Sequence, residues 1–140
     1  MKTLNRLLII CMTALILNII WEFSHYSLYV DLSGIPAYPH LILASFTDMF
    51  IILGIVIIVS VINKELKWIE KTSLKNYFFV IVLGLVIAVI IEEINLNLGR
   101  WQYTSSMPVI FGIGLSPLVQ IAVTGVLSII LTRIFIKYWD

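Results

Sequence analysis

The sequence contains little charge for its length. Only 12% of its 140 residues are Asp, Glu, Lys or Arg, about half the share found in globular proteins. By contrast, 61% of the residues are hydrophobic. This composition is typical of a membrane protein and leaves little material for a separate soluble domain. The net charge of +1 provides no excess of basic residues, so nucleic-acid binding has no support.

Cysteine is almost absent, since Cys11 is the one cysteine in the chain. A single cysteine excludes a disulfide within the chain. Cys11 lies in the first apolar stretch and is not preceded by the small residue of a lipoprotein cleavage site, so we interpret it as a small core residue. The basic start and apolar run resemble a signal peptide, but no small-residue cleavage site follows. We therefore expect an uncleaved first helix.

The sparse charges separate four long apolar stretches. Each is close to the roughly 20 residues that a helix needs to cross a bilayer. We predict spans at about residues 7–29, 41–63, 77–98 and 117–135, with Ser116 as the N-cap of the last span. The expected fold is all-α: one transmembrane domain, residues 1–140, forming an integral membrane four-helix bundle.

The basic residues are distributed unevenly between the connections. Only Arg100 lies between the third and fourth spans. The other eight flank the termini and the connection between the second and third spans: Lys2, Arg6, Lys64, Lys67, Lys71, Lys75, Arg133 and Lys137. Short loops rich in Lys and Arg stay in the cytoplasm. The pattern predicts a multi-pass protein of the plasma or inner membrane with both termini cytoplasmic.

Two connections carry further structure. Residues 64–76 alternate Lys with Glu, which indicates a short interfacial helix with Trp68 and Ile69 facing lipid. Residues 99–117 begin polar and aromatic and then become apolar. Because irregular backbone at membrane depth must be buried in protein or line a wet cavity, we expect a re-entrant or interfacial lid over the outer mouth of the bundle. The alternative is an ordinary loop whose Trp101 and Tyr103 join the aromatic belt.

Helical periodicity brings polar residues of different spans together near the outer side. At 1.5 Å per residue, Glu22 and Asp48 lie roughly 10 Å below the outer helix ends, and Glu92 only slightly less. Residues that share a face with these acids are Asn18, His25 and Tyr29 in the first span, and Gly84, Ala88 and Asn95 in the third; the fourth span adds the stripe Gln120, Thr124 and Ser128. The inner halves are almost purely Leu, Ile and Val. We expect an acidic pocket that opens outward.

Acid–base chemistry is the first function that this pocket suggests. One member of a close pair of buried carboxyls stays protonated at neutral pH, so Glu22 and Glu92 could act as acid and base, tuned by Asp48 and His25. Such a pair supports isomerisation, hydration or cyclisation of a lipid or isoprenoid. Candidate substrate-binding residues are Trp21, Glu93, Asn95, Arg100, Trp101, Tyr103 and Gln120. Four aromatic residues could line the pocket and stabilise a developing carbocation: Trp21, Phe23, Tyr26 and Trp101.

A divalent transition metal is a second possibility. Glu22 and His25 form half of the Glu-x-x-His pattern of di-iron bundles. Adding Asp48 and Glu92 gives one nitrogen and three carboxylates, which suits iron, manganese or zinc. The chain has no second Glu-x-x-His, and His40 is expected to lie too near the outer surface to help.

Two non-enzymatic functions stay open. Glu22, Asp48, Glu92 and Arg100 could form a structural network that binds a second copy or a partner membrane subunit, with Arg100 pairing with Glu93 or Asp31. Buried carboxylates also relay protons or bind cations in small transporters. Transport would require an oligomer, because the inner halves of the spans offer no polar exit path.

A set of short motifs resembles a group of short bacterial four-span membrane proteins. The motifs cover most of the chain: Trp21-Glu22, Asp48, Glu92-Glu93, Gly99-Arg-Trp-x-Tyr103, Met107-Pro108 and Ser116-Pro-Leu-x-Gln120. This resemblance implies the four-span fold and no particular reaction. The paired glutamates and the Gly-aromatic-x-Tyr segment also faintly resemble membrane carotenoid cyclases and hydratases, which implies acid–base chemistry on isoprenoids. The chain lacks their proline before the glutamate pair and is shorter than the full hydratases.

Overall fold

The computed structural model describes residues 3–31 and 36–139, which form four long helices. These are α1 (Thr3–His25), α2 (Ala37–Asn63), α3 (Leu74–Asn97) and α4 (Leu115–Trp139). The shorter elements are the 3-10 turns η1 (Tyr26–Leu28) and η2 (Leu66–Ile69) and the strands β1 (Val109–Ile110) and β2 (Ile113–Gly114). All four helices are long and apolar enough to cross a membrane. The expected all-α bundle with four helices of membrane-spanning length is therefore confirmed.

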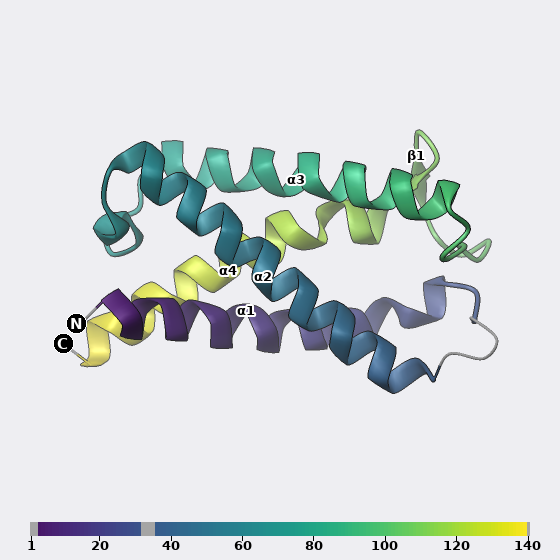
Figure 1. Ribbon diagram of the computed structural model, residues 1–140, viewed down its shortest axis with the longest axis horizontal. Coiled ribbons are helices and arrows are strands. Elements are labelled where there is room, and N and C mark those ends of the chain that lie inside the picture. The colour runs from purple at the N-terminus through teal and green to yellow at the C-terminus, as the bar shows by residue number, and fades with distance from the viewer. Residues whose placement is uncertain (1–2, 32–35, 140) are drawn as a thin grey trace.

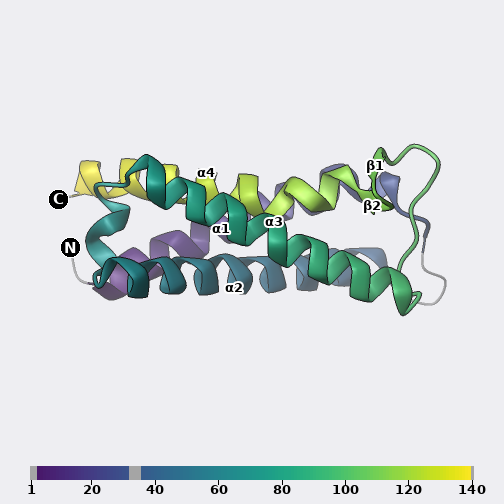
Figure 2. The ribbon, with the colours of Figure 1, turned by 90° about the horizontal axis from the view of Figure 1, so that it is seen from above.

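The two ends of the bundle differ in their connections and their charge (Figures 1 and 2). One end, called the basic end, holds the start of α1, the end of α4 and η2; the other, called the lid end, holds η1, the start of α2 and residues 98–114. Basic residues at the basic end are Arg6, Lys64, Lys67, Lys71, Lys75, Arg133 and Lys137, while Lys2 lies outside the described residues. The charge asymmetry of the sequence thus becomes an asymmetry along the bundle.

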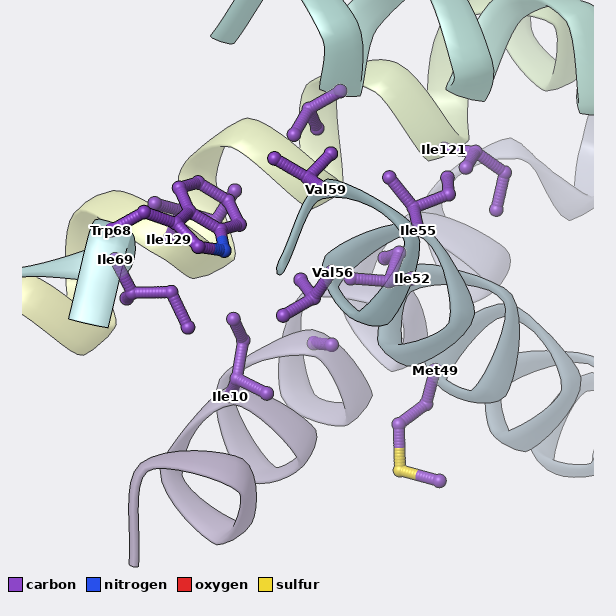
Figure 3. Packing of buried hydrophobic residues seen from close by; sticks show 12 residues of the cluster. Ile10, Met49, Ile52, Ile55, Val56, Val59, Trp68, Ile69, Ile121 and Ile129 are labelled. Atoms are coloured by element: carbon purple, nitrogen blue, oxygen red, sulfur yellow. The ribbon is translucent and has the colours of Figure 1, made fainter. Parts of the chain in front are cut away.

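The core lies mainly toward the basic end. Figure 3 shows it as a cluster of apolar side chains from all four helices and η2: Ile10, Ala14, Met49, Ile52, Ile55, Val56, Val59, Trp68, Ile69, Val80, Ile121 and Ile129. Around the bundle, α1 packs along α2 and α4, and α3 packs along α4, whereas α2 and α3 share far fewer contacts. In Figure 1 these two helices separate toward the lid end.

The connection from α2 to α3 differs from the expected interfacial helix. Trp68 and Ile69 were expected to face lipid, but they are 4% and 0% exposed and belong to the core. The helix α2 ends where Lys64 takes a left-handed conformation, φ 56°, and the chain folds back as η2. Trp68 Nε1 then donates to Ser60 Oγ at 2.8 Å, which satisfies the indole N–H inside the protein. The expectation was wrong because it assumed a continuous α-helical period.

An ion pair fixes this connection to the first helix. Arg6, only 6% exposed, donates from Nε to Glu70 Oε1 at 2.6 Å. Burial strengthens the attraction between the two charges but also removes water from them, and the loss of one partner would leave an uncompensated charge. Arg6 therefore joins α1 to the segment after η2.

Helix boundaries differ from the predicted spans at functionally relevant places. The helix α2 begins at Ala37 instead of 41, and Pro39 in its first turn is tolerated because that turn lacks intrahelical N–H partners. The helix α4 begins at Leu115 and runs to Trp139, instead of 117–135. Ser116 is therefore inside α4 and is not its N-cap.

A polar seam runs between α1 and α4. Thr13 Oγ1 lies 3.4 Å from both Thr132 Oγ1 and the Ser128 carbonyl oxygen, and Thr124 Oγ1 donates to Asn18 Oδ1 at 3.3 Å. The expectation that the inner halves carry almost no polar side chains is wrong at this interface. The hydroxyls also donate to carbonyls of their own helix, as Ser128 does to Thr124 at 2.6 Å. Small polar residues of this kind commonly join membrane helices.

The closest approach of α3 and α4 occurs at Gly84. A Cβ at this position would lie 2.8 Å from the backbone nitrogen and 2.9 Å from the Cα of Ala122. The predicted stripe of small residues on α3 therefore faces α4, with Gly84 and Ala88 both buried.

We expect Gly84→Ala to lower the free energy of unfolding by roughly 1–3 kcal/mol, because the added methyl meets backbone that cannot move aside. Thermal unfolding of the detergent-solubilised protein measures this. Gly54→Ala is the matched control, since a Cβ there has nothing within 4 Å and alanine favours a helix by up to about 1 kcal/mol. Equal melting temperatures for the two variants would contradict close packing at Gly84.

Candidate functional site

A cavity of 430 Å³ lies in the half of the bundle nearer the lid end. Its volume falls within the roughly 300–1,000 Å³ typical of small-molecule sites. Residues of all four helices line it, and most of its wall is apolar. The residues predicted from the sequence that line it are Glu22, His25, Asp48, Glu92, Asn95, Arg100, Trp101 and Gln120. The structure therefore brings eight of the eleven candidate site residues to one cavity.

The side-chain amide of Gln120 joins two of the acids. Gln120 Nε2 lies 2.7 Å from Glu22 Oε1, 2.7 Å from Asp48 Oδ2 and 3.2 Å from Asn18 Oδ1. An amide NH₂ has two hydrogens, so the two short contacts account for both of them. Gln120 thus connects α1, α2 and α4 at one point. The sequence identified Gln120 as polar but not as the bridge between the two carboxyls.

His25 is held between the acid cluster and α4. Its Nδ1 lies 2.8 Å from Ser116 Oγ, and its Nε2 lies 3.4 Å from Glu22 Oε2. Trp21 Nε1 donates to the same Ser116 Oγ at 3.2 Å. Ser116 was missed as a site residue because it was assigned to the helix cap. Its hydroxyl orients the imidazole whose other nitrogen faces Glu22.

The third acid is bound by the segment that follows α3. Glu92 Oε2 accepts hydrogen bonds from Tyr103 Oη and, at 3.3 Å, from Trp101 Nε1. Burial, together with the hydrogen bond to Glu92, raises the pKa of the Tyr103 phenol. Burial and the charge of Glu92 likewise raise the pKa of Tyr29. Both phenols are therefore neutral at ordinary pH, and Tyr103 donates its hydroxyl hydrogen to Glu92.

Aromatic rings and backbone hydrogen bonds close the lid end. The Tyr29 ring centroid lies 5.2, 6.5 and 5.5 Å from those of His25, Trp101 and Tyr103, each in an edge-to-face arrangement. Tyr29 and Tyr103 also form an antiparallel bridge. On either side of it, Val30 N donates to the Gln102 carbonyl and Thr104 N to the Leu28 carbonyl, both at 2.9 Å. The segment after α3 is thus attached to the end of α1.

The remainder of this segment forms a β-hairpin, which the sequence analysis did not anticipate. The strands β1 and β2 pair in register Ile110 with Ile113. Phe111 and Gly112 form the turn with φ of 51° and 82°, the pattern of tight hairpin turns. Figure 1 shows the hairpin beside the end of α3. A Phe-Gly pair between apolar residues was the available signal.

Some predicted contacts and placements are not observed. Arg100 Nη1 donates to Asn95 Oδ1 at 3.1 Å, not to Glu93 or Asp31, because α3 ends in a turn that directs Arg100 back over its own last turn. The tyrosine Tyr26 donates to Asp31 instead. Three substrate-binding candidates are not among the described residues that line the cavity: Trp21, Glu93 and Tyr103. Trp21 contacts Ser116, Glu93 is exposed, and Tyr103 contacts Glu92.

The predicted metal ligands do not form one group. Within residues 3–31 and 36–139, no three His, Cys, Asp or Glu side chains are grouped as metal ligands would be. Glu22, Asp48 and His25 make their contacts around Gln120 and Ser116, whereas Glu92 makes its contacts with Trp101 and Tyr103. The geometry gives no support to a shared ion. His40, in the first turn of α2, also lines the cavity.

Comparison with models of known protein families, with curated proteins and with solved structures finds no match. Function must therefore be argued from the site. Its arrangement is a mostly apolar cavity with two carboxyls sharing one amide, a third carboxyl bound by aromatic donors, and an imidazole beside the first pair. Groups of this kind can deliver and accept protons where water is scarce.

Replacing Gln120 with leucine should destabilise the protein by roughly 1–3 kcal/mol, because Glu22 and Asp48 then lose their shared donor inside the bundle. Chemical unfolding in detergent measures the change. The control is Gln102→Leu, at an exposed position, where a change within about 0.5 kcal/mol is expected. Equal effects of the two substitutions would show that the Gln120 bridge contributes nothing.

Alkaline titration tests the donor role of Tyr103. Ordinary tyrosines ionise near pH 10, but the raised pKa keeps Tyr103 a phenol through that range. The tyrosinate absorbance developed between about pH 9 and 11 should therefore be the same in wild type and in Tyr103→Phe. A loss equivalent to one tyrosine in the variant would mean that Tyr103 ionises normally and does not donate to Glu92.

Proposed function

We propose that this chain is a multi-pass membrane protein whose pocket carries out acid–base chemistry on a double bond of a lipid or isoprenoid. The observation that carries the proposal is the shared amide: Glu22 and Asp48 lie on one donor, Gln120, in a mostly apolar cavity that Glu92 also lines. Carboxyls are used for carbon protonation when water is kept away from them. The resulting reaction class is isomerisation, hydration or cyclisation.

Insertion into a cell membrane is part of this proposal. Four apolar helices of sufficient length and exposed Leu, Ile, Val and Phe side chains along them suit a hydrocarbon environment. The Lys and Arg residues gathered at the basic end support a topology in which that end, with both termini, lies in the cytoplasm. The lid end then lies at the outer interface, with Phe111 and its apolar neighbours in the hairpin close to the lipid.

The proposed proton transfers involve two groups of residues, the Glu22–Asp48 pair and Glu92. Two carboxylates this close in a mostly apolar cavity repel each other strongly when both are ionised, so we assign one shared proton to the Glu22–Asp48 pair. That proton adds to one carbon of the double bond and leaves a carbocation. Glu92 accepts two hydrogen bonds and needs no proton for either. Its carboxylate removes a proton from a carbon bonded to the cationic carbon. A new double bond forms, and return of the proton from Glu92 to the pair completes the cycle.

The surrounding residues suit a cationic intermediate. Trp101, Tyr26 and Tyr29 line the cavity, and aromatic faces stabilise positive charge. His25 beside Glu22 can accept or return a proton through that carboxyl. For hydration, a water molecule would attack the cation and lose its proton to Glu92.

A structural role is the second candidate. In residues 3–31 and 36–139, every buried side-chain nitrogen and oxygen has a hydrogen-bond partner, as expected if the polar network only holds the helices, a partner subunit or a second copy together. Proton or cation transport receives less support. The hydroxyls of the α1–α4 seam donate largely to backbone carbonyls and not to one another.

Solvent deuterium tests the proposed chemistry. The protein is reconstituted with total membrane lipid in heavy water, and the lipids are analysed by mass spectrometry. Protonation of carbon should place deuterium in a non-exchangeable position of one lipid species. We expect Glu22→Gln, Asp48→Asn and Glu92→Gln each to reduce this incorporation by roughly 100-fold or more, the lower range of proton-transfer contributions.

The matched control is Glu93→Gln, which removes the exposed neighbour of Glu92 and should incorporate deuterium as wild type does. Unfolding of each variant is measured in parallel. If wild type incorporates no deuterium while the three buried substitutions lower the melting temperature, the network is structural and the enzymatic proposal is wrong.

A further inference from the structure

The cavity reaches the lipid-facing surface of the bundle between α2 and α3. Its wall includes Leu43 and Thr47 of α2, both exposed, and Ala88 and Ile91 of α3. The neighbouring seams are closed, since α1 packs along α2 and α4, and α3 along α4. The helices α2 and α3 instead separate toward the lid end (Figure 1). The cavity is therefore open sideways along the α2–α3 seam; at the lid end the exposed residues Val30, Asp31 and Arg100 also line it.

This opening lies below the head-group level of a bilayer. Thr47 is ten residues beyond Ala37 (47 − 37), or about 15 Å along the helix. The helix α2 has 27 residues, about 40 Å, so it exceeds a hydrocarbon layer of about 30 Å by roughly 5 Å at each end. Thr47 then sits about 10 Å inside the hydrocarbon. A molecule that passes Thr47 must already be dissolved in lipid.

The charges around the cavity select the kind of molecule. The acids that line it are Glu22, Asp31, Asp48 and Glu92, and the histidines are His25 and His40. Arg100 is the single Lys or Arg among the described lining residues, and it donates to Asn95. With one proton shared by Glu22 and Asp48, acids still outnumber Arg100. Such a site repels a phosphate group, whereas a hydrocarbon chain with a hydroxyl or a double bond brings no charge.

We propose that the ligand reaches the acids sideways from the bilayer, between α2 and α3, and that it is an uncharged prenyl or acyl chain and not a phosphate ester. This inference rests on the proposed function, because it assumes insertion in a membrane and supplies the substrate class of the same pocket. The apolar residues Ile51, Ile91 and Ile121 hold the chain. Its reactive end lies between Gln120 and Trp101.

Binding of two probes tests the inference. Farnesol is an uncharged prenyl alcohol, and farnesyl phosphate is the same chain with an anionic head. Each is added to the protein in lipid nanodiscs, and the dissociation constant is measured by native mass spectrometry. We expect farnesol to bind at least tenfold more tightly than farnesyl phosphate. Thr47→Trp, which fills the mouth of the opening, should weaken farnesol binding at least tenfold.

Val61→Trp is the matched control, because Val61 is 71% exposed on the same helix and lies toward the basic end, away from the cavity. It should bind farnesol as wild type does. If Thr47→Trp does not fold, Leu43→Ala gives a second readout. This substitution widens the mouth of the opening and should raise the association rate of farnesol.

Each outcome bears on the proposal. Unchanged binding and association rates in the Thr47 and Leu43 variants would overturn the sideways route. Equal or tighter binding of farnesyl phosphate, or no farnesol binding by wild type, would overturn the uncharged ligand. Because binding requires no turnover, farnesol binding without deuterium incorporation would refute the acid–base chemistry and leave the route and ligand class standing.

Discussion

The hydrogen bonds of one amide organise the half of the molecule that contains the cavity. Gln120 of α4 is the donor on which Glu22 of α1 and Asp48 of α2 both depend. In an apolar environment no bulk water replaces a missing partner, and an unpaired buried carboxylate is far more costly than an unpaired hydroxyl. Together with the contacts of Ser116 to Trp21 and His25, this shared donor sets the relative positions of α1, α2 and α4 near the lid end, whereas the core toward the basic end depends mainly on apolar packing.

The polar seam along α1 and α4 connects the acid cluster near the lid end with the apolar core. Asn18 Oδ1 lies 3.2 Å from Gln120 Nε2 and 3.3 Å from Thr124 Oγ1, so the acid cluster continues into the row of hydroxyls between α1 and α4. Side-chain position in the cavity is thus set by helix contacts well outside it. This gives a physical reason why a catalytic arrangement could stay fixed although α2 and α3 separate beside it.

The sequence predicted the features that depend on composition and helical period. It did not predict the positions of residues that depend on the conformation of the chain where a helix ends. Four long helices and the shared face of Asn18, Glu22 and His25 follow from apolar runs and the 3.6-residue repeat. The burial of Trp68 depends on the left-handed residue that ends α2. The positions of Ser116 and Arg100 similarly depend on a hairpin and a helix-ending turn, whose tertiary contacts leave little trace in hydrophobic periodicity.

The ion pair between Arg6 and Glu70 has a consequence for the two leaflets of a bilayer. Together with the bond from Trp68 to Ser60, it fastens the α2–α3 connection beneath the bundle, where the two helices also share the apolar core. Any separation of α2 from α3 is then confined to the lid end, which faces the outer leaflet in the topology we propose. In that topology a lipid of the inner leaflet would have to flip across the membrane before it could enter, so the cavity would receive lipids from the outer monolayer alone.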